Sequence, residues 1–295
     1  MAVIVINWNS HELVGRSLRS LALSDYPNLR VILVDNGSND SSCAQLVNEF
    51  PQLDVIRLSP NGGFTGGANA GLRAAKAMRI DYYFLLTGVV APDAIRNLVR
   101  TAESDRHIGA LNPKIFYLHQ PSVVSHARGH FNWWLGLTRS HAHSRQRLPE
   151  RTEDVNFLTG SALLLRATAV EDVGLLDERF FMYFEDLDYT RRVKSAGYRA
   201  VYEPSSKVWH AVQGSVGRNT AKGTPIRFIN RNRLLLMRKH ASRLQWITFL
   251  PVLLLWHVLA HVAVYALRGE WEQVPAIFSG SYDYWRMRRS LRDSI

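Results

Sequence analysis

The chain has 295 residues, of which 46% are hydrophobic and 21% charged, and its formal net charge is +11. This composition predicts a globular protein with an ample core. The single cysteine, Cys43, excludes an internal disulfide framework and fits a reducing compartment. The positive charge suggests an anionic partner, such as nucleic acid, a phosphate-bearing substrate or an acidic membrane face. The apolar start at 2–6 is too short for a signal peptide, so we expect a first strand there.

Short apolar runs alternate with amphipathic segments through the first third of the chain. The expected strands are 2–6, 30–34, 55–58 and 82–86. Helices are expected after each of them, with Ser10 and Asp93 at the starts of the first and fourth. The alternation predicts an α/β fold, a Rossmann-like and mostly parallel sheet flanked by helices. Such sheets bind ligands beyond the carboxyl ends of their strands, so the loops after these strands are expected to face one crevice.

Regular patterning stops between 119 and 150. Five histidines and two tryptophans lie there without the spacing of a metal motif, and we expect a solvent-facing or acceptor-facing excursion. These residues are His119, His126, His130, His141, His143, Trp133 and Trp134. Strands are expected again at 157–166, which glycine interrupts, and at 198–202. The composition changes after Gly223, so we expect one domain over 1–223 and a basic, hydrophobic helical extension over 224–295.

The stretch 180–198 is the one most suggestive of chemistry. An aromatic run ends there in three carboxylates, Glu185, Asp186 and Asp188, and an amphipathic segment then stops at Gly197. Apolar surroundings and neighbouring carboxylates raise the pKa of a carboxyl group, which is how a general base is built. The alternative is the ordinary acidic first turn of a helix.

Three loops could bind parts of a ligand. Asp35, at the end of the second strand, could accept hydrogen bonds from a nucleobase imide or a ribose hydroxyl, or belong to a plain turn. The glycine-rich loop 61–71 could let the backbone approach a phosphate, although its spacing is not that of a dinucleotide fingerprint. His210, with Gly214 and Ser215 beyond it, could ligate a metal, touch a diphosphate or form a structural hydrogen bond.

Six motifs in this order resemble those of family 2 glycosyltransferases with a GT-A fold, in particular the rhamnosyltransferase-like branch that acts on bacterial cell-surface polysaccharides. They are VINWNS (5–10), VDNGSND (34–40), NGGFTGGANAG (61–71), FLTGSA (157–162), FFMYFEDLD (180–188) and H-x-x-G-x-S (210–215). The resemblance covers roughly residues 2–240. It implies a catalytic domain over 1–223 and an inverting transferase that uses a nucleotide-activated sugar.

The resemblance also implies residue roles. Asp186 would be the general base on the acceptor hydroxyl, with Glu185 beside it. The implied nucleotide-sugar contacts are Asn7, Asp35, Ser38, Asp40, Gly63, Asn69 and Thr87. The implied contacts with the acceptor or the diphosphate are Gly160, Trp209, His210 and Ser215, with His210 near the diphosphate or its metal. Independently of the resemblance, nearby cations could neutralise the departing diphosphate, or they could be plain surface charges: Arg191, Arg192, Arg218 and Lys222.

The chain departs from the family pattern at one position. After the fourth strand the family normally carries a metal motif that contains aspartate, whereas this chain has Thr87-Gly88, and Asp93 is interpreted as a helix cap. Mg²⁺ or Mn²⁺ is a possible cofactor, but a cation bound chiefly through carboxylates is in doubt. Either His210 and the cations handle the leaving group, or the chain is a weak or inactive relative that binds a nucleotide-sugar or a glycan.

The uncharged stretch 246–267 is long enough to cross a membrane, but Pro251, His257 and His261 interrupt it. We expect a helix in or on the inner leaflet, and four arginines support this: Arg286, Arg288, Arg289 and Arg292. The alternative is a helix buried against the main domain or a second subunit, so an oligomer is possible.

These features predict a set of partners and a location. The partners are a nucleotide-sugar donor, with dTDP-rhamnose as the first choice, a glycan or polyprenyl-diphosphate-linked acceptor, and a membrane surface. The location is cytoplasmic, peripheral or integral at the inner face of the bacterial cell membrane. Nucleic-acid binding is suggested by charge alone and is not expected, because the cations form no known reading module.

Overall fold

The computed structural model describes residues 1–140, 150–212 and 223–292, with side chains for 1–138, 150–212 and 223–287. Two compact units can be distinguished. The first comprises Met1–His130, Ser140–Phe181 and Glu185–Ser215. The second comprises Phe131–Arg139, Met182–Phe184 and Val216–Ile295. The second unit therefore includes two short segments from the middle of the chain that the sequence did not indicate.

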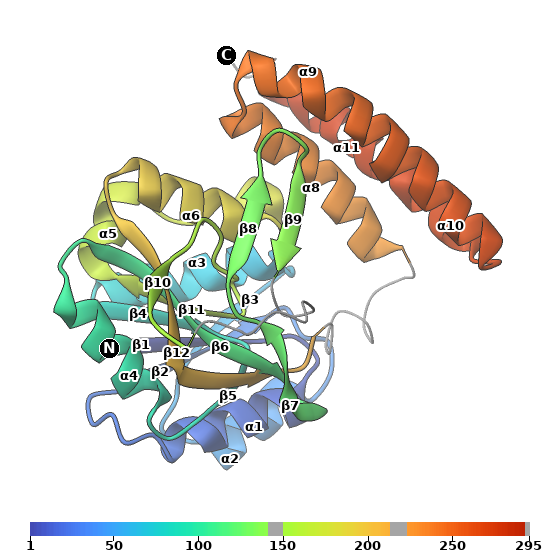
Figure 1. Cartoon of the computed structure of the whole chain (residues 1–295). Helices are drawn as coiled ribbons and strands as arrows, with labels where there is room; N and C mark the ends of the chain where they lie inside the picture. The colour runs from blue at the N-terminus through green and yellow to red at the C-terminus, as the bar shows by residue number, and fades with distance from the viewer. Residues whose placement is uncertain (141–149, 213–222, 293–295) are drawn as a thin grey trace. The chain divides into compact units, whose positions relative to one another are not determined.

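The N-terminal part of the first unit alternates strand and helix (Figure 1). Its strands are β1 (Ala2–Asn7), β2 (Arg30–Asn36), β3 (Asp54–Leu58) and β4 (Tyr82–Leu86). Its helices are α1 (His11–Ala22), α2 (Ser42–Glu49) and α3 (Gly63–Lys76). The strands pair in parallel in the order β4-β1-β2-β3. The four predicted strands are thus confirmed to within two residues at either end.

The rest of the first unit extends this sheet. Its strands are β5 (Gly88–Val90), β6 (Ile108–Tyr117), β7 (Gln120–His126), β10 (Glu153–Asp154), β11 (Ala162–Arg166) and β12 (Arg199–His210). Its helices are α4 (Ala94–Ser104), α5 (Ala167–Val173), the 3₁₀ turn η2 (Glu178–Phe180) and α6 (Glu185–Ser195). Within the described residues, the sheet runs β10-β12-β6-β11-β4-β1-β2-β3, with β5 paired to β12 and β7 to β6. It is parallel over its N-terminal part and mixed beyond β4, because β11 is antiparallel to both of its neighbours.

Helices cover both faces of the sheet, which the alternation along β1 explains. Successive strand side chains point to opposite faces. Val3 and Val5 pack in the core that includes residues of α1, α2 and α4, whereas Ala2 and Ile4 pack in the core that includes residues of α3, α5 and α6. An apolar layer therefore packs on each face of the sheet, and the polar residues that follow the strands lie at the carboxyl ends of the strands, outside both layers.

Some predicted elements are wrong in extent. Only 162–166 of the predicted strand 157–166 pairs as a strand, and the late strand continues to His210 past a register shift between Glu203 and Lys207. The excursion 119–150 contains β7, β8 (Gly129–Asn132) and β9 (Leu137–Ser140). Ser10 and Asp93 precede their helices as predicted, but neither side chain caps the helix.

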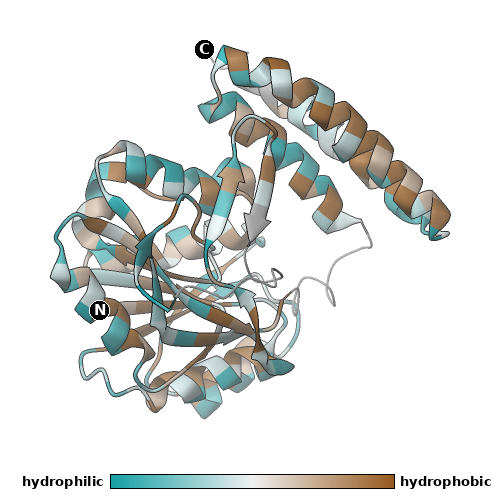
Figure 2. Cartoon of the chain, viewed as in Figure 1, coloured by the Kyte–Doolittle hydropathy of each residue, from teal (hydrophilic) through white to brown (hydrophobic). Residues whose placement is uncertain are grey.

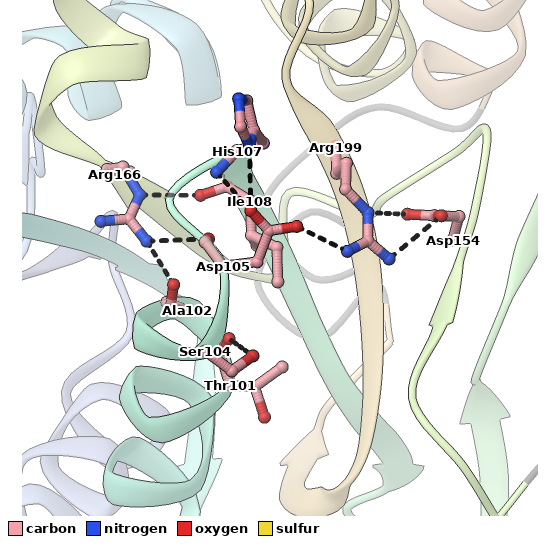
Figure 3. Close-up of polar contacts among 9 residues, drawn as sticks. All are labelled: Thr101, Ala102, Ser104, Asp105, His107, Ile108, Asp154, Arg166 and Arg199. Carbon is pink, nitrogen blue, oxygen red and sulfur yellow. Dashed lines mark hydrogen bonds and ion pairs between the residues drawn. The ribbon is translucent and has the colours of Figure 1, made fainter.

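A polar cluster joins the amino-terminal ends of two parallel strands, β6 and β12 (Figure 3). The Arg199 guanidinium bridges the carboxylates of Asp105 (2.8 Å) and Asp154 (3.0 Å). Arg166, at the end of β11, donates to the carbonyl oxygens of Ile108 (2.8 Å) and Ala102. These contacts lie at the opposite edge of the sheet from the polar loops described below, so this cluster serves the fold.

The second unit is mainly helical. Its helices are α8 (Thr224–His240), α9 (Arg243–Val252), the π-helical η3 (Leu253–Ala260), α10 (His261–Leu267), the 3₁₀ turn η4 (Trp271–Gln273) and α11 (Val274–Arg292). α9, η3 and α10 form one continuous helix of 25 residues, Arg243–Leu267. Phe249 is fully buried on the inward side of this helix, where a side chain at Gly136 would overlap its ring.

Candidate functional site

The polar ends of β1 and β2 form one hydrogen-bonded cluster. Asn7 and Asp35 are register partners, and the Asn7 amide donates to Asp35 Oδ1 (3.0 Å), Ser38 Oγ (3.1 Å) and Ser42 Oγ (2.9 Å). Ser38 Oγ also donates to Asp35 Oδ1 at 2.5 Å. Asp40 accepts from the amide N–H and the hydroxyl of Ser42. Asp35 is 7% exposed. The side chains of Asn7 and Ser38 both donate to its Oδ1, and these two hydrogen bonds fix the orientation of the carboxylate.

The glycine-rich start of α3 is fastened to β2. The Asn36 amide donates to Asn61 Oδ1 (3.0 Å) and to the carbonyl of Gly63 (2.9 Å), and Asn36 Oδ1 accepts from the Gly62 N–H (3.1 Å). Gly63 has φ +72°, and a Cβ there would overlap the carbonyl oxygen of Phe181. Only glycine suits both conditions. The structure therefore gives Gly63 a packing role between β2 and Phe181.

α3 also contacts the segment that leads to the predicted base. The Thr65 N–H and Oγ1 both donate to the Phe181 carbonyl, at 3.1 and 3.3 Å. The Phe64 ring lies 3.0 Å from where a Cβ of Gly160 would be, and Gly160 donates to Asp186. A continuous series of contacts thus joins the Asp35 loop, the start of α3 and Asp186 within the first unit.

The backbone before α6 is strained. Phe181, Tyr183 and Phe184 have φ values of 61°, 67° and 70°. Such angles cost roughly 1–3 kcal/mol each for residues other than glycine, and they persist only where the surroundings hold them. Phe181, with ψ −59°, is held by Thr65 as described. Backbone strain of this kind is concentrated at functional sites, and here it directly precedes Glu185 and Asp186.

Asp186 occupies the first turn of α6 and has the geometry of a base. Its Oδ2 accepts from the Gly160 N–H (3.1 Å) and its Oδ1 from the Leu187 N–H (2.8 Å). Burial raises the pKa of the Asp186 carboxyl to about 6, while the backbone N–H groups oppose this shift. The residue as a whole is half-buried. It is therefore ionised at neutral pH and can take up a proton with little further cost.

Glu185 differs from its neighbour. It is 6% exposed, and its Oε2 has no hydrogen-bond partner among the described residues. Burial, and then the charges of Asp186 and Asp188, raise its pKa well above the usual range of a glutamate. Asp188 is fully buried and is paired with Arg192 at 2.8 Å. Burial and like charges thus raise the pKa of Glu185, whereas the backbone N–H donors favour the ionised form of Asp186.

Thr87 and His210 meet beyond β4. The Thr87 N–H donates to Ser161 O (2.9 Å), and His210 Nδ1 donates to Thr87 O (2.8 Å). Gly88 pairs with His210, and a Cβ on Gly88 would lie 2.6 Å from Trp209 O. Burial lowers the pKa of His210, so the imidazole is neutral at pH 7. With its proton on Nδ1, its Nε2 carries the lone pair.

Two other predicted ligand contacts, Asn69 and Trp209, have partners within the protein. Both polar atoms of the buried Asn69 side chain bond the backbone of Leu176, at 2.9 and 3.0 Å, which favours a structural role. Trp209 stacks on Phe116 and donates to Pro121 O. Ser215 lies outside the described residues, as do Arg218, Lys222, His141 and His143.

Of the predicted cations near the leaving group, Arg192 is occupied. Its guanidinium bonds Asp188 and the carbonyl oxygens of Val173 and Leu175, each at 2.8–2.9 Å. It ties α6 to the segment after α5. The structure therefore assigns Arg192 to the fold. Arg191 is exposed.

A divalent cation can be tested against the donor atoms present. His210 Nε2 suits one metal bond. Thr87 and Gly88 contribute no carboxylate, and the described residues contain no group of three His, Cys, Asp or Glu side chains that could hold a metal. Mg²⁺ and Mn²⁺ prefer carboxylate and phosphate oxygens. The described residues do not fit a cation site built by the protein alone.

Several residues of the site carry no signal in the sequence pattern. Asn36, Ser42, Thr65 and Ser161 hold the functional loops together through the bonds given above. Their hydrogen bonds link segments from 25 to over 100 residues apart in sequence. Asn36, Thr65 and Ser161 lie inside the motifs given above, but the motifs do not show which partners these residues bond.

Comparisons with known proteins identify the family of the chain. Residues 1–233 match the family model described as "Glycosyltransferase like family 2". The N-acetylglucosaminyl-diphospho-decaprenol L-rhamnosyltransferase of Mycobacterium tuberculosis is 28% identical over 242 residues, 75% of this chain and 79% of that protein. The poly-beta-1,6-N-acetyl-D-glucosamine synthase of Staphylococcus epidermidis is 23% identical over 71% of this chain and 49% of that protein.

Solved structures show the same fold. GalNAc-T7 with UDP, GalNAc and Mn²⁺ has a TM-score of 0.63 at 16% identity, over 83% of this chain and 48% of that one. S. aureus TarS 1–349 in complex with UDP-GlcNAc has a TM-score of 0.61 at 15% identity, over 96% of this chain and 80% of that one. These neighbours confirm the predicted GT-A fold.

Proposed function

Because this chain belongs to glycosyltransferase family 2, we propose that it transfers a sugar from a nucleotide-activated donor to an acceptor hydroxyl with inversion at the anomeric carbon. One observation carries the proposal. The Asp186 carboxylate belongs to a half-buried residue, is fixed by the Gly160 and Leu187 N–H groups, and has a pKa of about 6. A base poised just below neutral pH suits proton removal from an alcohol as the alcohol attacks.

The transfer follows from this arrangement. Asp186 takes the hydroxyl proton while the acceptor oxygen bonds the anomeric carbon, and the bond from that carbon to the nucleotide diphosphate breaks on the opposite face. The Asp35 cluster would hold the nucleoside, since a fixed carboxylate at the carboxyl end of β2 can accept from an imide or ribose hydroxyl. Glu185, which is buried and has a raised pKa, would border the sugar and limit hydration of the base.

The donor and the acceptor are proposed by analogy with the M. tuberculosis relative. Its name specifies an L-rhamnosyl group and an N-acetylglucosaminyl-diphospho-decaprenol acceptor. We take L-rhamnose from dTDP-rhamnose as the donor, and a lipid-linked or polysaccharide acceptor in bacterial cell-surface glycan synthesis. The net charge of +11 suits two diphosphate-bearing substrates.

A donor screen tests the function. Purified protein is incubated with dTDP-rhamnose, UDP-GlcNAc and GDP-mannose, each with a short-chain polyprenyl-diphosphate-GlcNAc acceptor, with Mn²⁺ or with EDTA. Nucleotide release that requires the acceptor, and a product of inverted anomeric configuration by NMR, would support the proposal. Release that does not depend on the acceptor, or a product that retains configuration, would refute it.

A second candidate is a catalytically weak relative that binds a nucleotide-sugar or glycan. Thr87-Gly88 favours it, because no carboxylate follows β4 before Asp93 to help neutralise the leaving diphosphate. Calorimetric titration with the same donors separates the two candidates. Micromolar donor binding without turnover on any acceptor would select the binding protein.

We also propose that the second unit lies on the inner face of the bacterial membrane. The continuous helix Arg243–Leu267 is long and apolar enough to cross a bilayer, and hydrophobic residues follow its length in Figure 2. Large apolar side chains exposed on it are Leu244, Ile247, Leu250, Leu254, Leu255, Trp256, Leu259, Val264 and Leu267. Its other face packs inside the unit through Phe249 and His257, which are 0% and 2% exposed. One protein-covered face and one bare apolar face suit a helix lying in the membrane interface.

α11 adds residues typical of a membrane interface. Its exposed aromatic side chains are Phe278, Tyr282 and Trp285, and Trp271 precedes it. Tryptophan and tyrosine favour the headgroup region. Arg286 is a described and exposed cation there, while the side chains of Arg288, Arg289 and Arg292 lie outside the described residues. Anionic headgroups would complement these charges.

Vesicle sedimentation tests the membrane proposal. Substituting Leu254→Glu and Leu255→Glu together should release the protein from vesicles of anionic phospholipid. Leu23→Glu, at a leucine in the first unit that is 73% exposed, is the matched control and should leave binding intact. Unchanged sedimentation of the double variant would refute the proposal, as would a change from dimer to monomer with no vesicle binding in either form.

A further inference from the structure

Asn232 lies where the second unit holds the strained segment Met182–Phe184. Its side chain is fully buried on α8, and Nδ2 donates to the carbonyl oxygens of Met182 (2.7 Å) and Tyr183 (2.8 Å). Its Oδ1 accepts from Arg231 Nε at 2.8 Å. Two carbonyl acceptors fix which end of the amide is nitrogen. Asparagine is a poor residue for a helix interior, so this specific bonding gives a reason for its presence.

The same helix supports the next residue. The Arg233 guanidinium lies over the Phe184 ring at 5.6 Å, and Phe131 meets that ring edge-on at 6.4 Å between centroids. Tyr183 and Phe184 both have left-handed φ angles, so their conformation depends on such contacts. Phe181, directly before Met182, is held by hydrogen bonds from Thr65 of α3. Phe181 is thus held within the first unit, and Met182–Phe184 are held within the second unit by α8.

This segment sets the start of α6. Glu185 is the first residue of α6 and follows Phe184 directly, and Asp186 is in the same first turn. The bonds from Gly160 and Leu187 to Asp186 depend on the direction in which that turn begins. Displacements near 1 Å at reacting groups cost about 100-fold in rate. Relaxation of the two left-handed residues would rotate the first turn and move the carboxylate.

We propose that Asn232 is a positioning residue for Asp186, which it fixes by holding the carbonyl oxygens of Met182 and Tyr183. This inference rests on the proposed function of Asp186 as the base. It assigns a catalytic requirement to the second unit in addition to membrane contact.

The test compares two asparagines of α8. Asn232→Ala removes the bonds to the strained segment, whereas the control Asn230→Ala changes a residue that is 7% exposed and contacts Gly280 of α11. For Asn232→Ala we expect a fall in kcat of roughly 10- to 100-fold with the donor KM unchanged. The acid limb of the kcat profile should move to higher pH, because a displaced carboxylate loses N–H donors that favour its charge. Asn230→Ala should show neither change.

Two further measurements separate positioning from a purely structural role. In an Asp186→Asn background, Asn232→Ala should have no further effect on the residual rate; an equal loss in both backgrounds would overturn the proposal. Titration of the ¹³C-carboxyl signal of Asp186, identified by its loss in Asp186→Asn, should show a raised pKa in Asn232→Ala. An unchanged signal would also overturn it. The ¹³C titration needs no turnover. A wild-type protein that transfers no sugar would refute the proposed function, and the titration would still test whether Asn232 positions Asp186.

A folding control completes the design. Asn232→Gln keeps the amide and displaces it by one methylene, and it replaces Asn232→Ala if that variant does not fold. Equal kcat and equal pH profiles for Asn232→Gln, Asn230→Ala and the wild type would then overturn the proposal.

Discussion

Replacing Asp186 with asparagine should lower activity and raise stability together. The carboxyl pKa is about 6 in the folded protein and 3.8 in the unfolded reference, a difference of about 2 units that corresponds to about 3 kcal/mol. Because the pKa is higher in the folded protein, burial of the Asp186 carboxylate lowers the free energy of unfolding. This loss is absent below about pH 3.8, where the group is protonated in both states, and is complete above about pH 6. Asparagine avoids this loss but gives up one of the two N–H bonds, about 1 kcal/mol. Asp186→Asn should therefore be stabilised by about 2 kcal/mol at pH 8 and not at pH 4.

The activity of the same variant should fall by roughly 10²–10⁴-fold, as expected when a general base is removed. Donor-nucleotide release at pH 8 measures the rate, and urea unfolding at pH 4 and pH 8 measures stability. Glu185→Gln is the matched control, because glutamine has the shape of glutamate and the raised pKa of Glu185 already favours the uncharged form. It should keep most of the activity. The reasoning would be refuted if Glu185→Gln abolished transfer while Asp186→Asn retained it.

Other substitutions test the remaining parts of the structure. Gly63→Ala should destabilise the protein by roughly 2 kcal/mol or more, because the new methyl group would meet Phe181 O at a left-handed φ; an unchanged urea midpoint would contradict this. Asp35→Asn should weaken donor binding about tenfold or more by calorimetry with a smaller effect on kcat, whereas equal affinities would remove Asp35 from the nucleoside site. Arg199→Ala should lower Tm slightly at low salt and not in 1 M salt, since its ion pairs are exposed; an equal decrease at both salt concentrations would argue against an ionic origin.

The carboxylate pair shows how one environment can assign two roles. Glu185 and Asp186 are adjacent in sequence, but only Asp186 receives backbone N–H donors on both oxygens. Glu185 is more deeply buried and has an oxygen without a partner among the described residues. Burial raises the pKa of both carboxyl groups, but the N–H donors oppose this shift at Asp186, whereas neighbouring carboxylates add to it at Glu185.

Two predicted strands, 157–166 and 198–202, differ in extent from the strands of the structure because contacts between distant segments decide where pairing begins and ends. Residues before Ala162 carry an apolar pattern, but the Thr159 N–H is taken by Asn112 and the Gly160 N–H by Asp186, so neither can join a ladder. The late strand was predicted over 198–202, whereas β12 continues to His210 through Pro204. The structure accommodates the residues around Pro204 in a register shift, and pairing with β6 resumes at Lys207.

The sequence by itself determined the alternation of strand and helix, the polar edge after β1 and β2, and the carboxylates at the start of α6. Each of these depends on periodicity or on neighbours within a few residues, which a linear pattern records. Only the tertiary structure decided that Asn69 and Arg192 serve the fold, that Gly63 makes room for Phe181, and that Asn232 holds the backbone before the base. The physical reason is that these roles consist of hydrogen bonds and close contacts between distant segments. A buried polar side chain satisfies whichever partner the fold brings to it.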